Sequence, residues 1–191
     1  MSTLQVVLIV LAILVVAALA AFAWRAARSR ALREQFGPEY DRVVELEPSK
    51  SAAERELRER QRRHSELSLR ELSEEDRARF SDEWAQVQSR FVDAPQEAAL
   101  EAEGLISRLV AARGYPTDDY DEQLAQLSVD HATALAEYRD AHEISERGNN
   151  SEASTEQLRQ AMVRYRAIIG ELLGERPVNS AYDAEHPVPQ R

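Results

Sequence analysis

Residues 6–24 read Val-Val-Leu-Ile-Val-Leu-Ala-Ile-Leu-Val-Val-Ala-Ala-Leu-Ala-Ala-Phe-Ala-Trp, an unbroken run of nineteen apolar residues. As an α-helix with about 1.5 Å of rise per residue, the run is roughly 28 Å long, close to the roughly 30 Å hydrocarbon core of a bilayer. Such a run needs lipid or a surrounding protein core, and the remaining sequence is too polar to supply that core. We therefore predict a transmembrane anchor at residues 1–24 that contacts the lipid bilayer through residues 4–24.

A cleaved signal peptide is the competing interpretation of this run. Signal peptides have a basic start, an apolar stretch of about 7–15 residues and a small-x-small cleavage site. Residues 1–5 contain no Lys or Arg, and the run is longer than that stretch. Small-x-small triplets do occur at 18–20 and 21–23, in alanine-rich sequence where they arise easily. The pattern favours an uncleaved anchor, whereas cleavage near Ala23 would give a secreted or periplasmic helical protein.

Positive charge follows the run at once. Residues 25–33 contain four arginines, at positions 25, 28, 30 and 33, whereas residues 1–24 contain none. Positively charged residues next to a span remain on the cytoplasmic side of the membrane. We therefore expect a single-pass protein of the plasma membrane, with its N-terminus outside and its C-terminal domain in the cytoplasm.

The rest of the chain is acidic and lacks cysteine. The net charge is −10, and because residues 25–33 carry +4, residues 34–191 carry −14. An acidic domain is repelled by the phosphate backbone, so we expect no nucleic acid partner. The absence of cysteine excludes disulfides, thiol nucleophiles and cysteine metal ligands.

Glycine and proline divide residues 25–72, which we predict to be a basic collar and a charged helical spacer. The helix of the span should continue to about Phe36 and stop at residues 37–38, Gly-Pro, with a second break at residues 46–49. Ser51 and Glu54 form a capping-box pattern that opens a charged helix over about 51–67. This helix has few apolar residues, so we expect it to be solvated.

Residues 73–173 have the pattern of a small helical bundle. Helices are predicted at about 74–92, 95–112, 118–127, 131–146 and 155–173. The expected N-terminal caps are Ser73 with Asp76, Asp130, and Ser154 with Gln157. Gly114 is expected to end the second of these helices, and residues 147–153 are expected to be a polar loop. No stretch shows strand alternation, and each apolar stripe is too narrow to be stable alone, so the helices must pack on one another. Residues 174–191 are predicted to be a disordered tail.

Two apolar stripes have heptad-like spacing. The first is Phe80, Trp84, Val87 and Phe91, and the second is Leu158, Met162, Tyr165, Ile169 and Leu172. Either stripe could serve a coiled coil. Two short stripes separated by other helices fit packing within one bundle better. The sequence thus predicts an all-α protein with one N-terminal transmembrane helix, a charged spacer helix and a small helical bundle.

The residues that could carry chemistry form no recognisable site. The four histidines are His64, His131, His142 and His186, and we found no His-x-x-x-His or Glu-x-x-His spacing. The acidic residues at 118–122 are those expected at a helix start. Motifs for nucleotide binding, esterase or protease activity are absent from the sequence. We therefore expect no catalytic residues, no cofactor site, no metal site and no enzyme activity.

Several segments together resemble a known group of proteins. They are residues 33–41 (REQFGPEYD), 90–93 (RFVD), 113–116 (RGYP), 128–131 (SVDH) and 154–162 (STEQLRQAM). With these segments the chain resembles a group of uncharacterised bacterial single-span membrane or secreted proteins. The resemblance covers most of the chain from residue 33 to the last helix. It implies no known activity, so no site residue is carried over from it, and it fits both an anchored and a secreted protein.

These observations favour a non-enzymatic interaction or scaffold module, anchored in the membrane and acting at its cytoplasmic face. Its protein partner is not identifiable from the sequence, and Trp84, Tyr115 or Tyr120 would be contact residues if left outside the core. The alternative is an envelope enzyme, or an accessory subunit of one, that uses Asp130 and His131 with the acidic residues at 118–122.

Overall fold

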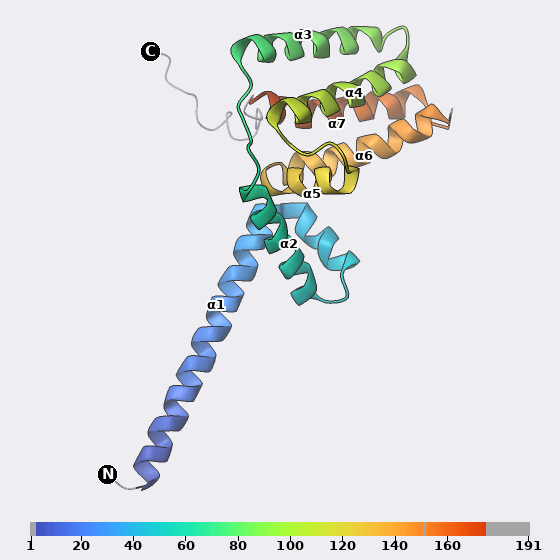
Figure 1. Cartoon of the computed structure of the whole chain (residues 1–191). Coiled ribbons are helices and arrows are strands. Elements are labelled where there is room, and N and C mark those ends of the chain that lie inside the picture. The colour runs from blue at the N-terminus through green and yellow to red at the C-terminus, as the bar shows by residue number, and fades with distance from the viewer. Residues whose placement is uncertain (1–2, 151, 175–191) are drawn as a thin grey trace, which may run out of the picture. The chain divides into compact units, whose positions relative to one another are not determined.

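The computed structural model describes residues 3–150 and 152–174, and these residues form seven helices and no strand (Figure 1). The predicted all-α fold is confirmed. The chain divides into two compact units, Met1–Glu59 and Arg60–Arg191, which we describe in turn. The predicted tail lies, from residue 175 onward, outside the described residues.

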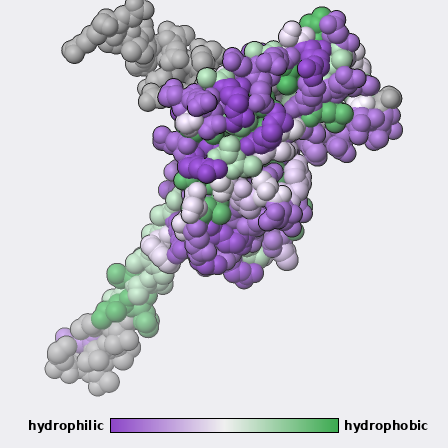
Figure 2. Space-filling view, turned by 45° about the horizontal axis from the view of Figure 1, so that its top comes forward, coloured by the Kyte–Doolittle hydropathy of each residue, from purple (hydrophilic) through white to green (hydrophobic). Residues whose placement is uncertain are grey.

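Helix α1 (Thr3–Leu46) carries the apolar run. The large apolar side chains at positions 11–24 are each more than half exposed, and Figure 2 shows them as a green stretch beside mostly hydrophilic surface. Within the described residues, this is the one helix long and apolar enough to cross a membrane. By the same criterion it could serve as a signal sequence, because it lies near the N-terminus.

Gly37 interrupts α1 as the sequence predicts. Its φ of 44° and ψ of −122° are not helical, and this backbone region is essentially restricted to glycine. Pro38 follows and cannot donate to the preceding turn. The helix resumes after this kink and ends at Leu46, which is the second break that the sequence predicts.

Helix α2 (Lys50–Ser65) differs in two respects from the predicted spacer. Its N-terminal cap is Ser49, whose Oγ accepts a hydrogen bond from the Ala52 backbone N–H at 3.2 Å, whereas Ser51 was expected in this role. The helix is also not fully solvated, because Ala53 and Leu57 are completely buried. The sequence pattern missed this burial because two small apolar surfaces in a charged helix give almost no periodic signal.

The first unit holds its two helices together with a buried polar contact. The Tyr40 hydroxyl, after the kink in α1, donates to the Glu54 carboxylate of α2 at 3.1 Å. Four apolar side chains of α1 are buried as well: Leu32, Phe36, Tyr40 and Val43. The kink at Gly37 therefore allows α1 to fold back and form a small helical hairpin with α2 (Figure 1).

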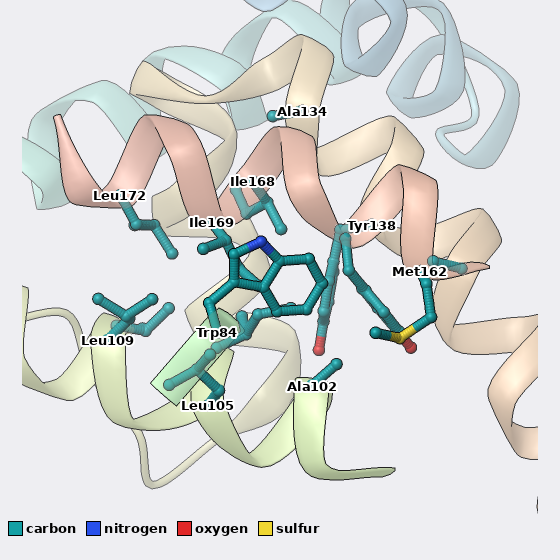
Figure 3. Close-up of a cluster of buried hydrophobic side chains, with 14 of the residues drawn as sticks. Trp84, Ala102, Leu105, Leu109, Ala134, Tyr138, Met162, Ile168, Ile169 and Leu172 are labelled. Atoms are coloured by element: carbon teal, nitrogen blue, oxygen red, sulfur yellow. The ribbon is translucent and has the colours of Figure 1, made fainter. Parts of the chain in front are cut away.

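The second unit is a bundle of helices α3 (Glu74–Arg90), α4 (Pro95–Arg113), α5 (Tyr120–Asp130), α6 (Ala132–Asn149) and α7 (Thr155–Leu173). Helices α6 and α7 pack most extensively, and α4 lies against both of them and against α3. Trp84 of α3 is central to the core. Figure 3 shows its indole between side chains of α4 and α7, including Leu105, Leu109, Ile168, Ile169 and Leu172.

The structure confirms most of the predicted helix ends in this unit. Ser73 caps α3, Gly114 ends α4 with a left-handed φ of 91°, and Ser154 forms a capping box with Gln157. The two heptad-like stripes lie in the same core, as packing within one bundle requires, although Phe91 at the end of the first stripe is only partly buried.

Two predicted boundaries are wrong. Asp130 is the last residue of α5 and does not cap α6, which begins after His131 without a side-chain cap. Helix α6 also continues to Asn149, into the predicted loop at 147–153, because Ser145 and Gly148 are buried and continue its packed face. At the start of α5, Asp119 is the N-terminal cap and accepts from the Glu122 N–H at 2.9 Å.

The segment between α2 and α3 is attached to the C-terminal end of α4. The Arg70 backbone N–H donates to the Arg113 carbonyl at 3.0 Å, and the Arg70 Nε donates to the Ala112 carbonyl at 2.7 Å. A Cβ added at Gly114 would lie 2.8 Å from the Ser68 carbonyl oxygen. Gly114 is therefore required both for its left-handed backbone and for the close approach of this segment.

We predict that Gly114→Ala lowers the free energy of unfolding by about 1–3 kcal/mol, through backbone strain and this close contact. Gly104→Ala is the matched control, because Gly104 lies inside the same helix with only ordinary contact, 3.6 Å, to Arg108. It should raise stability by about 0.5–1 kcal/mol. Urea unfolding of the full chain in detergent, followed by circular dichroism, measures both. Equal effects of the two substitutions would contradict the role of Gly114.

Candidate functional site

Helices α4, α6 and α7 bring three ionisable or phenolic side chains into one hydrogen-bonded group. One oxygen of the Glu103 carboxylate lies 3.0 Å from His142 Nδ1 and accepts from the Tyr165 hydroxyl at 2.5 Å. Tyr165 also lies 2.9 Å from the Ser145 hydroxyl. We refer to Glu103, His142 and Tyr165 as the Glu103 network.

Aromatic rings surround the Glu103 network. The ring of Tyr138 stacks on His142 at 6.1 Å and 20°, and the ring of Tyr120 lies 5.4 Å from His142. Burial raises the pKa of Tyr138 and of Tyr165, so both phenols stay neutral over the physiological range. Neutral phenols can donate hydrogen bonds but cannot act as bases, which favours a structural role for them.

Glu103 also sets the charge of His142. The hydrogen bond to Glu103 raises the pKa of His142 above its ordinary value, although burial acts in the opposite direction. When His142 is protonated, its Nδ1 donates to the Glu103 carboxylate, and the pair is then a charge-assisted hydrogen bond between α4 and α6.

Glu103, His142 and Glu146 are also the residues that could hold a metal ion. Each offers one ligand atom, and the three atoms lie within 4.8 Å of one another. A histidine nitrogen with two carboxylate oxygens suits a borderline divalent cation such as Zn²⁺. The sequence alone predicts no metal site. The His142-x-x-x-Glu146 spacing was visible on one helix, but Glu103 comes from another helix and only tertiary packing brings it there.

The two histidine–carboxylate contacts near α5 differ from the pairing that the enzyme alternative required. His131 Nδ1 lies 2.7 Å from Glu171 of α7, whereas Asp130 lies 3.3 Å from His64 Nε2. Glu122 contacts Arg63 at 3.1 Å and Gln126 at 2.5 Å. Asp130 and His131 therefore have separate partners, Asp119 is used for capping, and Glu122 pairs with Arg63 of α2.

Tyr115 lies between the two histidines of this region. Its ring centroid is 6.1 Å from that of His64 and 6.2 Å from that of His131. Burial raises the pKa of Tyr115 to about 12, so its hydroxyl remains neutral. That hydroxyl and the Nε2 atoms of both histidines make no hydrogen bond to the described part of the chain, although His64 lies close to Asp130.

Three aromatic residues are candidate contact residues from the sequence, and not all of them lie at the surface. Trp84 and Tyr115 are buried, whereas Tyr120 is 43% exposed beside His142. Trp84 is thus a core residue of the bundle and cannot serve as a contact surface.

A shallow hollow of about 250 Å³ lies on the bundle between α3 and α7, and we call it the α3–α7 hollow. Its apolar lining is Phe91 at the end of α3 with Met162 and Val163 of α7, and two arginines, Arg159 and Arg166, border it. The four α7 residues recur at intervals of 3, 1 and 3, which places them on one side of the helix. Val163 is 54% exposed, and Val92 next to Phe91 is 83% exposed.

A second hollow, of about 400 Å³, lies in the first unit between the collar of α1 and the first turn of α2. We call it the collar hollow. Its cationic lining is Arg25, Arg30, Arg33 and Lys50, and its anionic lining is Glu54. The sequence places the arginines in the collar, whereas only the fold places Lys50, the single lysine of the chain, beside them.

Comparisons with models of protein families, with curated proteins and with solved structures found no match to this chain.

We predict that the Glu103–His142 pair makes the bundle more stable in mild acid than in mild alkali. Because the folded pKa of His142 is raised, its stabilisation is complete below the unfolded pKa of about 6.5 and is lost as pH rises through the folded pKa. Thermal unfolding at pH about 5.5 and about 8.5 should therefore show a larger loss from His142→Gln at the lower pH.

Glu103→Gln should remove this pH dependence, since it removes the charge that raises the pKa of His142. Glu143→Gln is the control for a neighbouring exposed carboxylate and should leave the dependence intact. A loss from His142→Gln that is equal at both pH values would show that the pair contributes no pH-dependent stability.

Proposed function

We propose that this chain is a single-pass membrane protein whose helical bundle is a non-enzymatic docking module for another protein at the cytoplasmic face. The observation that carries the proposal is the apolar first part of α1, in which the described large apolar side chains from Leu11 to Trp24 are all exposed. Water would penalise that exposure heavily, at roughly 25 cal/mol per Å² of apolar surface, and a bilayer removes the penalty.

The charge distribution supports the orientation. Arg25, Arg28, Arg30 and Arg33 follow the apolar segment directly, whereas no positively charged side chain precedes it. Moving the collar across the membrane would cost more than moving the short uncharged N-terminal segment. The proposed orientation therefore leaves the collar and the bundle in the cytoplasm.

The α3–α7 hollow is the surface that we assign to the protein partner. Val163 is 54% exposed and lines the hollow together with Phe91 and Met162, and the neighbouring residue Val92 is 83% exposed. Apolar surface rimmed by polar groups is typical of protein interaction sites.

Charge complementarity defines the kind of partner. Arg159 and Arg166 border the apolar lining, although Arg159 also pairs with Glu156 at 2.7 Å. A partner segment with one or two apolar side chains flanked by Asp or Glu would bury the apolar lining and pair with these arginines.

The described contacts of the Glu103 network satisfy its own polar groups, which supports a binding role over a catalytic role for the bundle.

The absence of cysteine allows a direct test of the orientation. We predict that Ser2→Cys reacts with a membrane-impermeant maleimide in intact cells, whereas Ser89→Cys, exposed on α3, reacts only after lysis. The reverse pattern would contradict the proposed orientation. Mass spectrometry of the mature N-terminus completes the test, because a start near Ala23 would identify α1 as a cleaved signal sequence.

We predict that Val163→Glu weakens retention of the protein partner about tenfold, since it places a charge in the apolar lining and repels the acidic flanks of the partner segment. Leu100→Glu is the matched control, because Leu100 is an exposed apolar residue of α4 outside the hollow. Co-purification from membranes in mild detergent compares both variants with the unaltered chain. Equal retention by the two variants would exclude the α3–α7 hollow as the contact surface.

A further inference from the structure

The collar hollow combines features that no other described hollow shares. It borders the end of the apolar segment, since Phe22 lines it together with Arg25. The fold of the first unit then adds the first turn of α2, with Lys50 and Ser51, to the same hollow. Its volume of about 400 Å³ lies within the range of roughly 300–1,000 Å³ typical of small-ligand sites.

The charges that line this hollow are mostly positive. Arg25, Arg30 and Lys50 contribute cations, and in the described part of the chain Arg25 and Arg30 make no ion pair. Arg33 is already bound to Asp41 at 2.5 Å, so it contributes less. An anion would therefore find at least two unneutralised guanidinium groups and an ammonium group at one place.

Glu54 is the one carboxylate in the lining, and its charge is largely compensated. Its side chain is 8% exposed, accepts from the Tyr40 hydroxyl, and lies 3.8 Å from Lys50 and 3.9 Å from Arg58. Burial acts to raise the pKa of Glu54, but hydrogen bonds and these cations outweigh burial and lower it. Glu54 thus remains an anion that holds Lys50 in place at the edge of the hollow.

Lys50 lies in the first turn of α2, where Glu54 at 3.8 Å offsets only part of the unfavourable interaction with the helix end. The N-terminus of a helix carries a partial positive charge and attracts anions, so a lysine in the first turn is repelled. No acidic residue occupies the first turn of α2. An anionic group in the collar hollow would interact favourably with Lys50, with the positive end of α2 and with the arginines of α1.

From this arrangement we propose that the collar hollow binds the phosphate of an anionic phospholipid, with the acyl chains lying along the apolar segment past Phe22. The inference rests on the membrane attachment proposed above, since only an inserted α1 places the hollow at the level of the lipid headgroups. The rest of the chain, with its excess of carboxylates, is repelled by an anionic bilayer. The hollow would thus be the specific point of attraction to that bilayer.

The test compares bound lipid on the full chain by native mass spectrometry after release from nanodiscs that contain equal amounts of phosphatidylcholine and phosphatidylglycerol. The unaltered protein should retain phosphatidylglycerol in preference to phosphatidylcholine. Arg30→Gln and Lys50→Gln should each reduce that preference about fivefold, as expected from losing one cation at an anionic headgroup. Both side chains are exposed, so neither substitution should disturb folding, and circular dichroism checks this.

Arg28→Gln is the matched control. Arg28 belongs to the same collar and carries the same charge, but its guanidinium lies 5.2 Å from the Trp24 ring and is not part of the hollow. A specific site predicts that Arg28→Gln leaves the lipid preference nearly unchanged. Equal losses from Arg28→Gln and Arg30→Gln would show diffuse attraction to the collar and would overturn the proposal, as would the absence of any phosphatidylglycerol preference.

Two further arms separate the remaining outcomes. In the first arm, inorganic phosphate is added to the protein in neutral detergent, and chloride at equal ionic strength is the control. If the protein retains phosphate but shows no lipid preference, the ligand is a soluble anion and the lipid proposal is overturned. Flotation of the protein with neutral liposomes tests membrane attachment separately. Failure to float would remove the basis of both proposals, whereas flotation without lipid preference would overturn the lipid site alone.

Discussion

The apolar first part of α1 exposes side chains that no other described residue buries, and the remaining structure is organised around that constraint. Water opposes the exposure in proportion to its area, and the second unit is built around a hydrophobic core of its own. The chain therefore separates into a segment suited to lipid and a hydrophilic part suited to water. The cationic collar lies where these two parts meet, and the kink at Gly37 begins the return of the chain toward that collar.

The bundle shows how buried polar groups are used when a small core cannot exclude them. Glu103 accepts from Tyr165 and lies against His142, and Glu171 lies against His131, so carboxylates and histidines compensate one another between helices. Raised phenol pKa values keep Tyr138 and Tyr165 neutral inside this region. A partly buried hydrogen-bonded group of this kind helps to fix which helix faces meet, because moving one helix would separate a carboxylate from its partner.

The two hollows lie in different units and suit different ligands. The collar hollow is cationic and adjoins the apolar segment, which suits the phosphate of a lipid. The α3–α7 hollow is apolar with two bordering arginines, which suits a short protein segment. An anchored module that recognises its membrane with one unit and its protein partner with the other would account for the unequal distribution of charge along the chain.

The sequence by itself determined the helical class, the apolar segment, the collar and most helix ends, because these depend on local periodicity, capping side chains and glycine or proline at defined positions. The left-handed end of α4 at Gly114 and the Ser154–Gln157 box are examples that need only neighbouring residues, whereas the close approach of Ser68 to Gly114 depends on tertiary structure. Tertiary structure decided what depends on distant partners. It buried Leu57 in a helix that looked solvated, joined Glu103 to His142, separated Asp130 from His131 and brought Lys50 to the arginines of α1. Those outcomes follow from which helix faces pack together, and residue spacing within one helix carries no information about the face of another.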